Sequence, residues 1–353
     1  MENFPTEEIR FVNHDLRQKD LRRPTLKQVC MLYSTSVILL MFLASRVQRW
    51  NEKPGLLITE VGLILPLPLI FLLYNRYDLK RVLRLNKISV LNLFLTFCLI
   101  VFAIPIVNIL NSWYLLLVRV VFGRVEATSV APANDWKGLL INVLIIGVSA
   151  GICEETLFRG TIMRGFERFG AYPAIVFTAF LFGLWHIYFT SFMGTFLLGI
   201  LIGWVVYRTN SIFSGMFAHF TNNAASVLLA FLVDQLSKAR GSGLDNAARE
   251  SVDQSFSKIL DQSSSQLIGY FVSQGLVLLF FAIIFTGIAI AFIRTTSGKQ
   301  EIAPRERVLG QQNSLVWLLP GLAFIAFVYV ALGLALMDRR VEWVIDVLRF
   351  IGL

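Results

Sequence analysis

The chain has 353 residues, of which 56% are hydrophobic and only 16% charged, and its mean hydropathy is +0.66. Soluble domains carry about 25% charged residues, so this composition excludes a soluble cytoplasmic enzyme. The formal net charge of +9 comes from Lys and Arg that stand singly or in small groups between apolar runs, where such residues contact lipid head groups. We therefore expect contact with a lipid bilayer and no binding of nucleic acid.

The apolar runs are long enough to cross about 30 Å of hydrocarbon as helices, and no alternating strand pattern recurs. We predict an all-α fold, a polytopic transmembrane helical bundle of eight to nine spans. The predicted spans are Val29–Ser45, Leu56–Tyr74, Val90–Leu110, Leu139–Phe158, Pro173–Phe189, Phe192–Tyr207, Ile212–Val233, Leu267–Ile293 and Leu315–Met337. We expect an integral multi-pass protein in the plasma membrane of a bacterium.

Composition divides the chain into five regions. They are a polar basic N-terminal segment (1–28), N-terminal transmembrane helices (29–135), a helical core that carries ionisable residues (136–233), an extramembrane insertion (234–266) and C-terminal transmembrane helices (267–353). In the insertion, Val252, Phe256, Ile259 and Leu260 recur at helical spacing and predict one amphipathic helix.

The first polar cluster of the core is the sequence CEETLFRG, residues 153–160. A charge at membrane depth costs at least ~2.5–3.5 kcal/mol on insertion scales, so it normally faces the protein interior. Glu155 and Arg159 are four residues apart, which predicts an ion pair on one helix. Glu154 points about 100° away and lacks that partner, so we expect a buried carboxyl group suited to accept a proton near neutral pH. The alternative is that both carboxylates only hold helices together.

The second cluster is FGLWH, in which His186 is the sole titratable group. If the chain reverses near Phe169–Gly170, Glu154 lies 15–16 residues before the turn and His186 about 16 after it. Two antiparallel helices would then bring these side chains to one depth.

The third cluster is HFTNN, which places His219 and Asn223 four residues apart on one helix face, with Asn222 beside that face. Buried amides supply fixed N–H donors. Two small-xxx-small pairs, which favour close helix packing, lie nearby: Gly147 with Gly151, and Gly199 with Gly203.

EETLFRG, FGLWH and HFTNN together resemble the ordered motifs EExxxR, FxxxH and HxxxN of the CPBP intramembrane proteases (CAAX protease and bacteriocin-processing, also called Abi or type II CAAX endopeptidase-like). The resemblance covers about residues 136–233. It implies that Glu154 and His186 activate a water molecule and that His219 and Asn223 bind the oxyanion. The supporting positions are Glu155, Arg159 and Asn222.

The cofactor requirement is open at this stage. Glu154, His186 and His219 are candidate ligands for a Zn²⁺ with one open position. Asn is a poor zinc ligand and a good oxyanion donor, which favours metal-independent water activation. The zincin motif HExxH does not occur. Residues 147–151 match GxSxG around Ser149, but that nucleophile motif needs a strand-to-helix turn and this segment reads as an apolar helix.

We therefore predict an intramembrane endopeptidase that hydrolyses peptide bonds of membrane-associated or lipid-modified proteins or peptides. A non-catalytic membrane scaffold or regulator that retains the polar helix core is the alternative. A secondary transporter that uses Glu and His as a proton relay is disfavoured because the chain lacks mirrored halves.

Overall fold

The computed structural model describes residues 23–125, 133–239, 252–300 and 312–337, and within these ranges the chain forms helices and no strand. The predicted all-α polytopic bundle is confirmed there. Eight of the described helical stretches are long and apolar enough to cross a membrane: Leu26–Trp50, Glu52–Tyr74, Val90–Phe122, Trp136–Phe169, Phe189–Thr209, Ile212–Ala239, Ser264–Thr295 and Asn313–Leu336.

The first described elements, from Leu26 onward, form a helical hairpin. Its elements are α2 (Leu26–Leu39), η1 (Leu40–Ala44), α3 (Ser45–Trp50), α4 (Glu52–Leu57), η2 (Ile58–Ile64) and α5 (Pro66–Tyr74). The extended backbone of Asn51 ends α3 and begins α4. Next to this turn, a Cβ atom on Gly55 would lie 2.5 Å from Cα of Gln48, so only glycine allows the two helices this close together. The short α6 (Leu79–Val82) and the long α7 (Val90–Phe122) follow.

The central region is one long span and three further helices. The span comprises α8 (Trp136–Asn142), η3 (Val143–Ser149), α9 (Ala150–Leu157), η4 (Phe158–Ile162), α10 (Met163–Phe166) and η5 (Glu167–Phe169). The chain then reverses at Gly170, whose φ of 103° suits glycine. This reversal agrees with the predicted turn. Then come α11 (Ala171–Trp185), α12 (Phe189–Thr209) and α13 (Ile212–Ala239).

The helix α11 is shorter than the span predicted for this segment. It has 15 residues, whereas a membrane-spanning helix needs about 20. It ends because Ile187 takes a φ of 68°, a left-handed conformation that costs about 1–2 kcal/mol for a residue with a Cβ atom. The chain therefore turns at residues 186–188, and α12 begins three residues before its predicted start.

The C-terminal region packs on both sides of this centre. Its elements are α15 (Val252–Leu260), α16 (Ser264–Thr295), η6 (Gln312–Leu318) and α17 (Leu319–Leu336). The amphipathic helix predicted in the insertion is α15, and Asp253 on it binds Arg119 of α7 at 2.8 Å. Parts of the five predicted regions lie outside the described residues: 1–22, 126–132, 240–251, 301–311 and 338–353.

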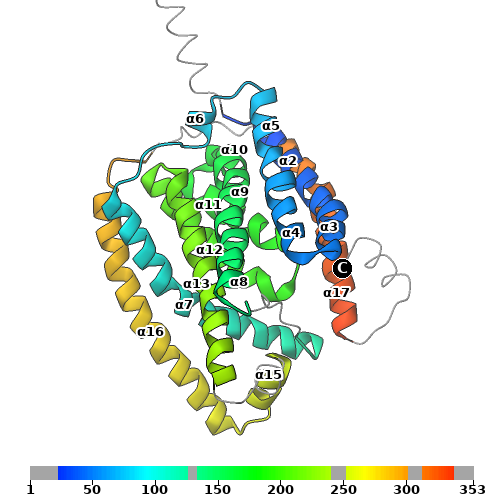
Figure 1. The fold of residues 1–353 in the computed structure, drawn as a ribbon, viewed down its shortest axis with the longest axis vertical. Coiled ribbons are helices and arrows are strands. Elements are labelled where there is room, and N and C mark those ends of the chain that lie inside the picture. The colour runs from blue at the N-terminus through cyan, green and yellow to red at the C-terminus, as the bar shows by residue number, and fades with distance from the viewer. Residues whose placement is uncertain (1–22, 126–132, 240–251, 301–311, 338–353) are drawn as a thin grey trace, which may run out of the picture.

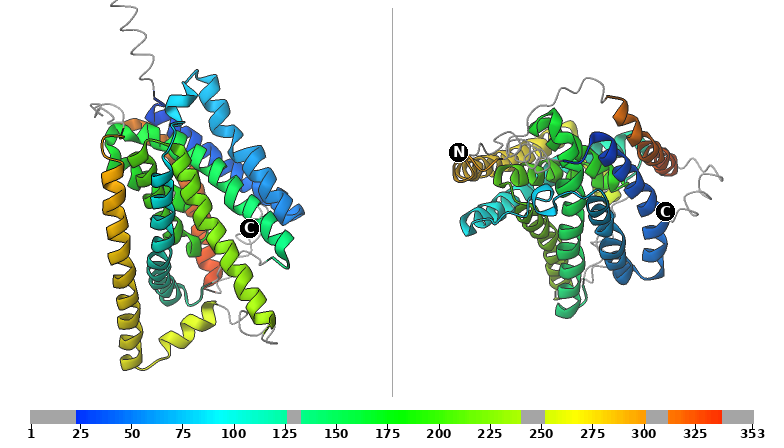
Figure 2. Two further views of the ribbon diagram at one scale, coloured as in Figure 1. Left: turned by 60° about the vertical axis from the view of Figure 1, so that its left-hand side comes forward. Right: turned by 90° about the horizontal axis from the view of Figure 1, so that it is seen from above.

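The figures show how the centre is enclosed. In Figure 1, α9 to α13 lie between α16 and α7 on one side and α2, α3 and α17 on the other. Figure 2 shows α16 at the outer edge of the bundle in both further views, and only 6% of its most apolar window is buried in protein. The central helices carry all three sequence clusters.

Close packing of the central helices depends on the small residues singled out in the sequence. A Cβ atom on Gly151 of α9 would lie 3.1 Å from the carbonyl oxygen of Met216 on α13. A Cβ atom on Gly199 of α12 would lie 3.0 Å from Cβ of Ala179 on α11. These approaches bring α9, α11, α12 and α13 within side-chain reach of one another.

Candidate active site

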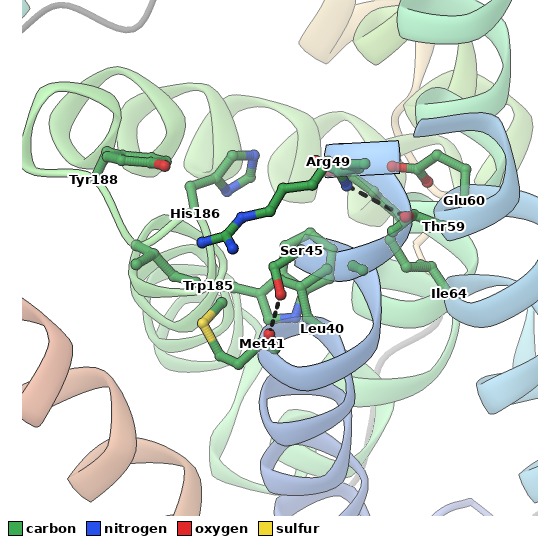
Figure 3. Close-up of a pocket in the computed structure, with 14 residues that line it drawn as sticks. Leu40, Met41, Ser45, Arg49, Thr59, Glu60, Ile64, Trp185, His186 and Tyr188 are labelled. Carbon is green, nitrogen blue, oxygen red and sulfur yellow. Dashed lines mark hydrogen bonds between the residues drawn. The ribbon is translucent and has the colours of Figure 1, made fainter. Parts of the chain in front are cut away.

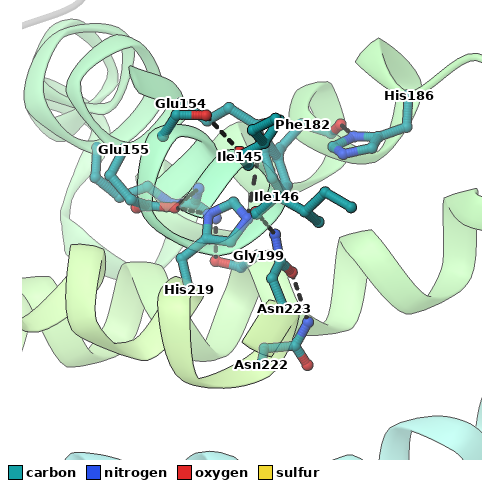
Figure 4. Close-up of polar contacts among 12 residues, drawn as sticks. Ile145, Ile146, Glu154, Glu155, Phe182, His186, Gly199, His219, Asn222 and Asn223 are labelled. Carbon is teal, nitrogen blue, oxygen red and sulfur yellow. Dashed lines mark hydrogen bonds and ion pairs between the residues drawn. The ribbon is translucent and has the colours of Figure 1, made fainter. Parts of the chain in front are cut away.

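Three segments of the core supply the polar side chains of the site, and Figure 4 shows them together. The two adjacent glutamates lie on α9 and the arginine on η4. One histidine follows the end of α11, and the other histidine and the two asparagines lie on α13. The residues concerned are Glu154, Glu155, Arg159, His186, His219, Asn222 and Asn223.

Glu155 is the centre of a buried ionic cluster. Its Oε1 atom accepts hydrogen bonds from Nη1 of Arg159 at 2.9 Å and from Nδ1 of His219 at 2.8 Å. The predicted ion pair between Glu155 and Arg159 is therefore present. Arg159 also donates through Nη2 to the carbonyl oxygen of Gly199 at 3.0 Å, and its guanidinium lies 4.5 Å from the ring centre of Phe182. The cluster joins α9, η4, α12 and α13. Because its members are buried, the loss of one of them would leave an uncompensated charge and destabilise this junction.

Glu154 has different surroundings from Glu155, although the two are adjacent in sequence. It is 6% exposed, and its Oε2 atom lies 4.0 Å from Nε2 of His219. Within the described residues, no group hydrogen-bonds to that oxygen. The ion pair expected from the helical spacing thus belongs to Glu155, and Glu154 makes only the longer contact with His219.

A cavity of about 420 Å³ reaches Glu154 and His186 from the side of the first two spans. Figure 3 shows side chains of η1, α3, η2 and α11 around it. The polar or aromatic side chains that line it include Ser45, Arg49, Thr59, Glu60, Trp185 and Tyr188. The structure therefore brings Glu154 and His186 to one cavity, as the depth argument expected.

Glu60 is a residue of this cavity that the motifs did not indicate. It is the one carboxylate between Leu56 and Tyr74, an apolar run predicted to span the membrane. Charged residues in such runs usually face a functional interior, so this isolated carboxylate was the signal available in the sequence.

His186 and His219 are not in contact, because the ring of Phe182 lies between them. Its centre is 4.7 Å from the ring of His186 and 6.0 Å from that of His219. Nδ1 of His186 is 2.9 Å from the carbonyl oxygen of Phe182, so Nδ1 carries the proton in that hydrogen bond. In a neutral imidazole this leaves Nε2 as an acceptor.

The two asparagines lie beside His219 on α13 and do not line the cavity. Nδ2 of Asn223 donates to the carbonyl oxygen of Ile146 at 2.9 Å, and Nδ2 of Asn222 donates to Oδ1 of Asn223 at 3.1 Å. The amide of Asn223 thus ties α13 to η3 in this arrangement.

The candidate zinc ligands do not form a binding group. Within the described ranges, no three His, Cys, Asp or Glu side chains are placed to hold a metal ion. Phe182 separates two of the three candidates, His186 and His219.

Ser149 does not form a nucleophile elbow. It lies in η3, and its hydroxyl donates to the carbonyl oxygen of Ile145 one turn earlier. The helical backbone on both sides of this residue lacks the strand-to-helix turn that the motif requires.

The fold and the site together define a multi-pass α-helical membrane protein with an ionisable cluster between its helices. Residues 136–225 match the family model described as type II CAAX prenyl endopeptidase Rce1-like. This match agrees with the resemblance to the CPBP proteases, and it covers 90 of the 353 residues. At the family level the match indicates a CAAX-type intramembrane endopeptidase with a peptide or protein substrate. Comparison with curated proteins and with solved structures gave no match.

Proposed function

We propose that the chain is an intramembrane endopeptidase in which Glu154 and His186 activate the attacking water. The observation that carries this proposal is the cavity of about 420 Å³ that both side chains line, among helices of the bundle. Peptide hydrolysis needs a nucleophilic water, donors for the oxyanion and a proton for the leaving amine.

In the proposed reaction, a water molecule bridges the Glu154 carboxylate and Nε2 of His186. Glu154 accepts a proton from this water as its oxygen attacks the carbonyl carbon of the substrate. The same proton then passes to the nitrogen of the leaving amine as the C–N bond breaks. Because the attacking oxygen ends in the new carboxyl group, atoms and charges balance without a metal.

The oxyanion is assigned to His219 and Asn223. Nδ1 of His219 already donates to Glu155, so His219 serves as an oxyanion donor through Nε2 when both ring nitrogens carry protons. Asn223 reaches the oxyanion by exchanging its hydrogen bond to Ile146 for one to the substrate. Glu155 and Arg159 orient His219, and Asn222 orients Asn223.

We propose membrane-associated or lipid-modified proteins or peptides as substrates. The support is the position of the cavity inside a bundle of membrane-spanning helices, together with the family match.

The test compares membranes that contain the wild type with membranes that contain Glu154→Gln, which keeps the size of the side chain. Mass spectrometry should detect cleavage products that depend on the wild type and vanish in the variant, while the yield of folded protein stays equal. Glu52→Gln is the control, because Glu52 is an exposed acid on α4. Identical products from both proteins would contradict the peptidase assignment and favour a scaffold or regulator.

A further inference from the structure

Glu60 is a second carboxyl group beside the proposed catalytic carboxylate. It stands on η2 of the second span and is 8% exposed. Its side chain points toward the cavity in Figure 3. It lies outside residues 136–225, so the family match says nothing of its role.

Glu60 and Glu154 line the same cavity, and the helical turns that carry them, η2 and α9, pack against each other. The second oxygen of each, Oε2, has no hydrogen-bond partner among the described residues. A hydrogen bond between two carboxyl groups requires a proton on one of them. With one proton shared by the two residues, one carboxyl group can donate a hydrogen bond to the other. Oε2 of each residue then remains available to accept a hydrogen bond in this buried setting.

The backbone around Glu60 holds this contact in place. Gly55 lets α4 approach the backbone of α3 closely, as described above, and Nε2 of Gln48 on α3 donates to Oγ1 of Thr59 at 3.2 Å. Thr59 is the neighbour of Glu60 in η2, and η2 packs against α9, which carries Glu154. A π-helical turn such as η2 is often found at functional sites.

Placing the carboxyl group of Glu60 beside that of Glu154 in a buried setting lowers the stability of the folded protein. A buried carboxyl group with an unpaired oxygen is costly, and buried polar groups can often be replaced by apolar ones of similar volume without loss of stability. Packing alone therefore gives no reason for a carboxylate at this position. Residues that lower stability in this way are typical of functional sites.

We propose that Glu60 is a positioning residue for the peptidase: its carboxyl group donates a hydrogen bond to Glu154 and holds that carboxylate toward the cavity and its water. The inference rests on the proposed function. It assigns a part of the site to the N-terminal spans, which the three motifs do not cover.

The experiment compares Glu60→Leu and Glu60→Gln with the wild type, with Glu52→Gln as the control acid. The probe is a synthetic peptide that spans a bond cleaved by the wild type and not by Glu154→Gln. For each protein, kcat, KM and the melting temperature in detergent are measured.

Glu60→Leu removes the hydrogen bond, so we expect kcat to fall about 10- to 100-fold, the order of loss for a displaced catalytic group. KM should stay within about threefold, and the melting temperature should be unchanged or higher. Glu60→Gln retains an N–H donor toward Glu154 and should keep kcat within about threefold of the wild type.

Two results would overturn the inference alone: wild-type kcat in Glu60→Leu, or a kcat for Glu60→Gln as low as that for Glu60→Leu. A fall of kcat in Glu60→Leu that is matched by a large loss of melting temperature would also overturn it, because the role would then be structural. Cleavage that persists in Glu154→Gln, or no wild-type cleavage of any substrate, would overturn the proposed function and this inference together.

Discussion

His219 and Glu155 are joined by a hydrogen bond of 2.8 Å, from Nδ1 to the carboxylate oxygen that also accepts from Arg159. One oxygen therefore holds a histidine of α13 and an arginine of η4. This relationship separates the roles of the two adjacent glutamates. Glu155 fixes the positions of other side chains, and the neighbouring Glu154 is left to face the cavity.

Arg159→Ala should reduce both folded yield and activity. Removing one partner of a buried ion pair leaves the other charge uncompensated, which costs about 3–5 kcal/mol in the free energy of unfolding. Thermal unfolding in detergent and cleavage of a peptide substrate measure the two effects. Lys238→Ala is the matched control, because its ion pair with Asp234 at 2.6 Å involves a lysine side chain that is 48% exposed. Because the lysine side chain is about half exposed, its removal should cost less than removal of the buried Arg159, and equal losses in the two variants would contradict the prediction.

Asn223→Ala should lower kcat by about 10²–10³, the usual loss for one oxyanion donor. Asn223→Asp should be at least as damaging, because it places an acceptor or a negative charge where negative charge develops. Asn222→Ala should have a smaller effect, since the proposed role of Asn222 is to orient Asn223 through their hydrogen bond. Steady-state kinetics with folded protein test the order of the three variants. Full turnover in Asn223→Ala would remove this residue from the oxyanion site.

Metal removal should have little effect on cleavage. The described residues offer no three-ligand group, and Phe182 separates His186 from His219. We expect purified protein to hold far less than one equivalent of zinc by elemental analysis and to keep its activity in chelator. About one equivalent of zinc, together with reversible loss of activity on chelation, would instead show that the three candidate ligands move together to bind it.

Gly151→Val should destabilise the bundle at the crossing of α9 and α13. The added atoms would meet the backbone at Met216, and forced overpacking typically costs 1–3 kcal/mol. Gly275→Val is the control, because nothing lies within 4 Å of a Cβ atom at Gly275 on α16. Melting temperatures of the two variants should differ by several degrees. If the Gly151→Val protein were as stable as the control, α9 and α13 would be able to move apart without loss of stability, which would contradict the prediction.

Features that depend on residues near in sequence could be predicted. The spans follow from apolar runs of sufficient length, and the ion pair of Glu155 with Arg159 follows from their spacing of four on a helix. The 15-residue length of α11 could not be predicted this way. It depends on the left-handed turn at Ile187, where the apolar sequence continues without a Gly or Pro to mark the break.

The sequence by itself determined the class of the protein, an all-α membrane bundle, and the three segments that carry its ionisable residues. The length of an apolar run and its helical periodicity depend only on residues near one another in sequence, so a single sequence is enough to recognise them. Only the tertiary structure decided that Glu155 binds His219, that Phe182 separates the two histidines and that Glu60 and Glu154 line one cavity from different spans. Glu155 and His219 are 64 positions apart in the sequence, Phe182 and His219 are 37 apart, and Glu60 and Glu154 are 94 apart. These arrangements depend on how the helices pack against one another, which no local pattern specifies.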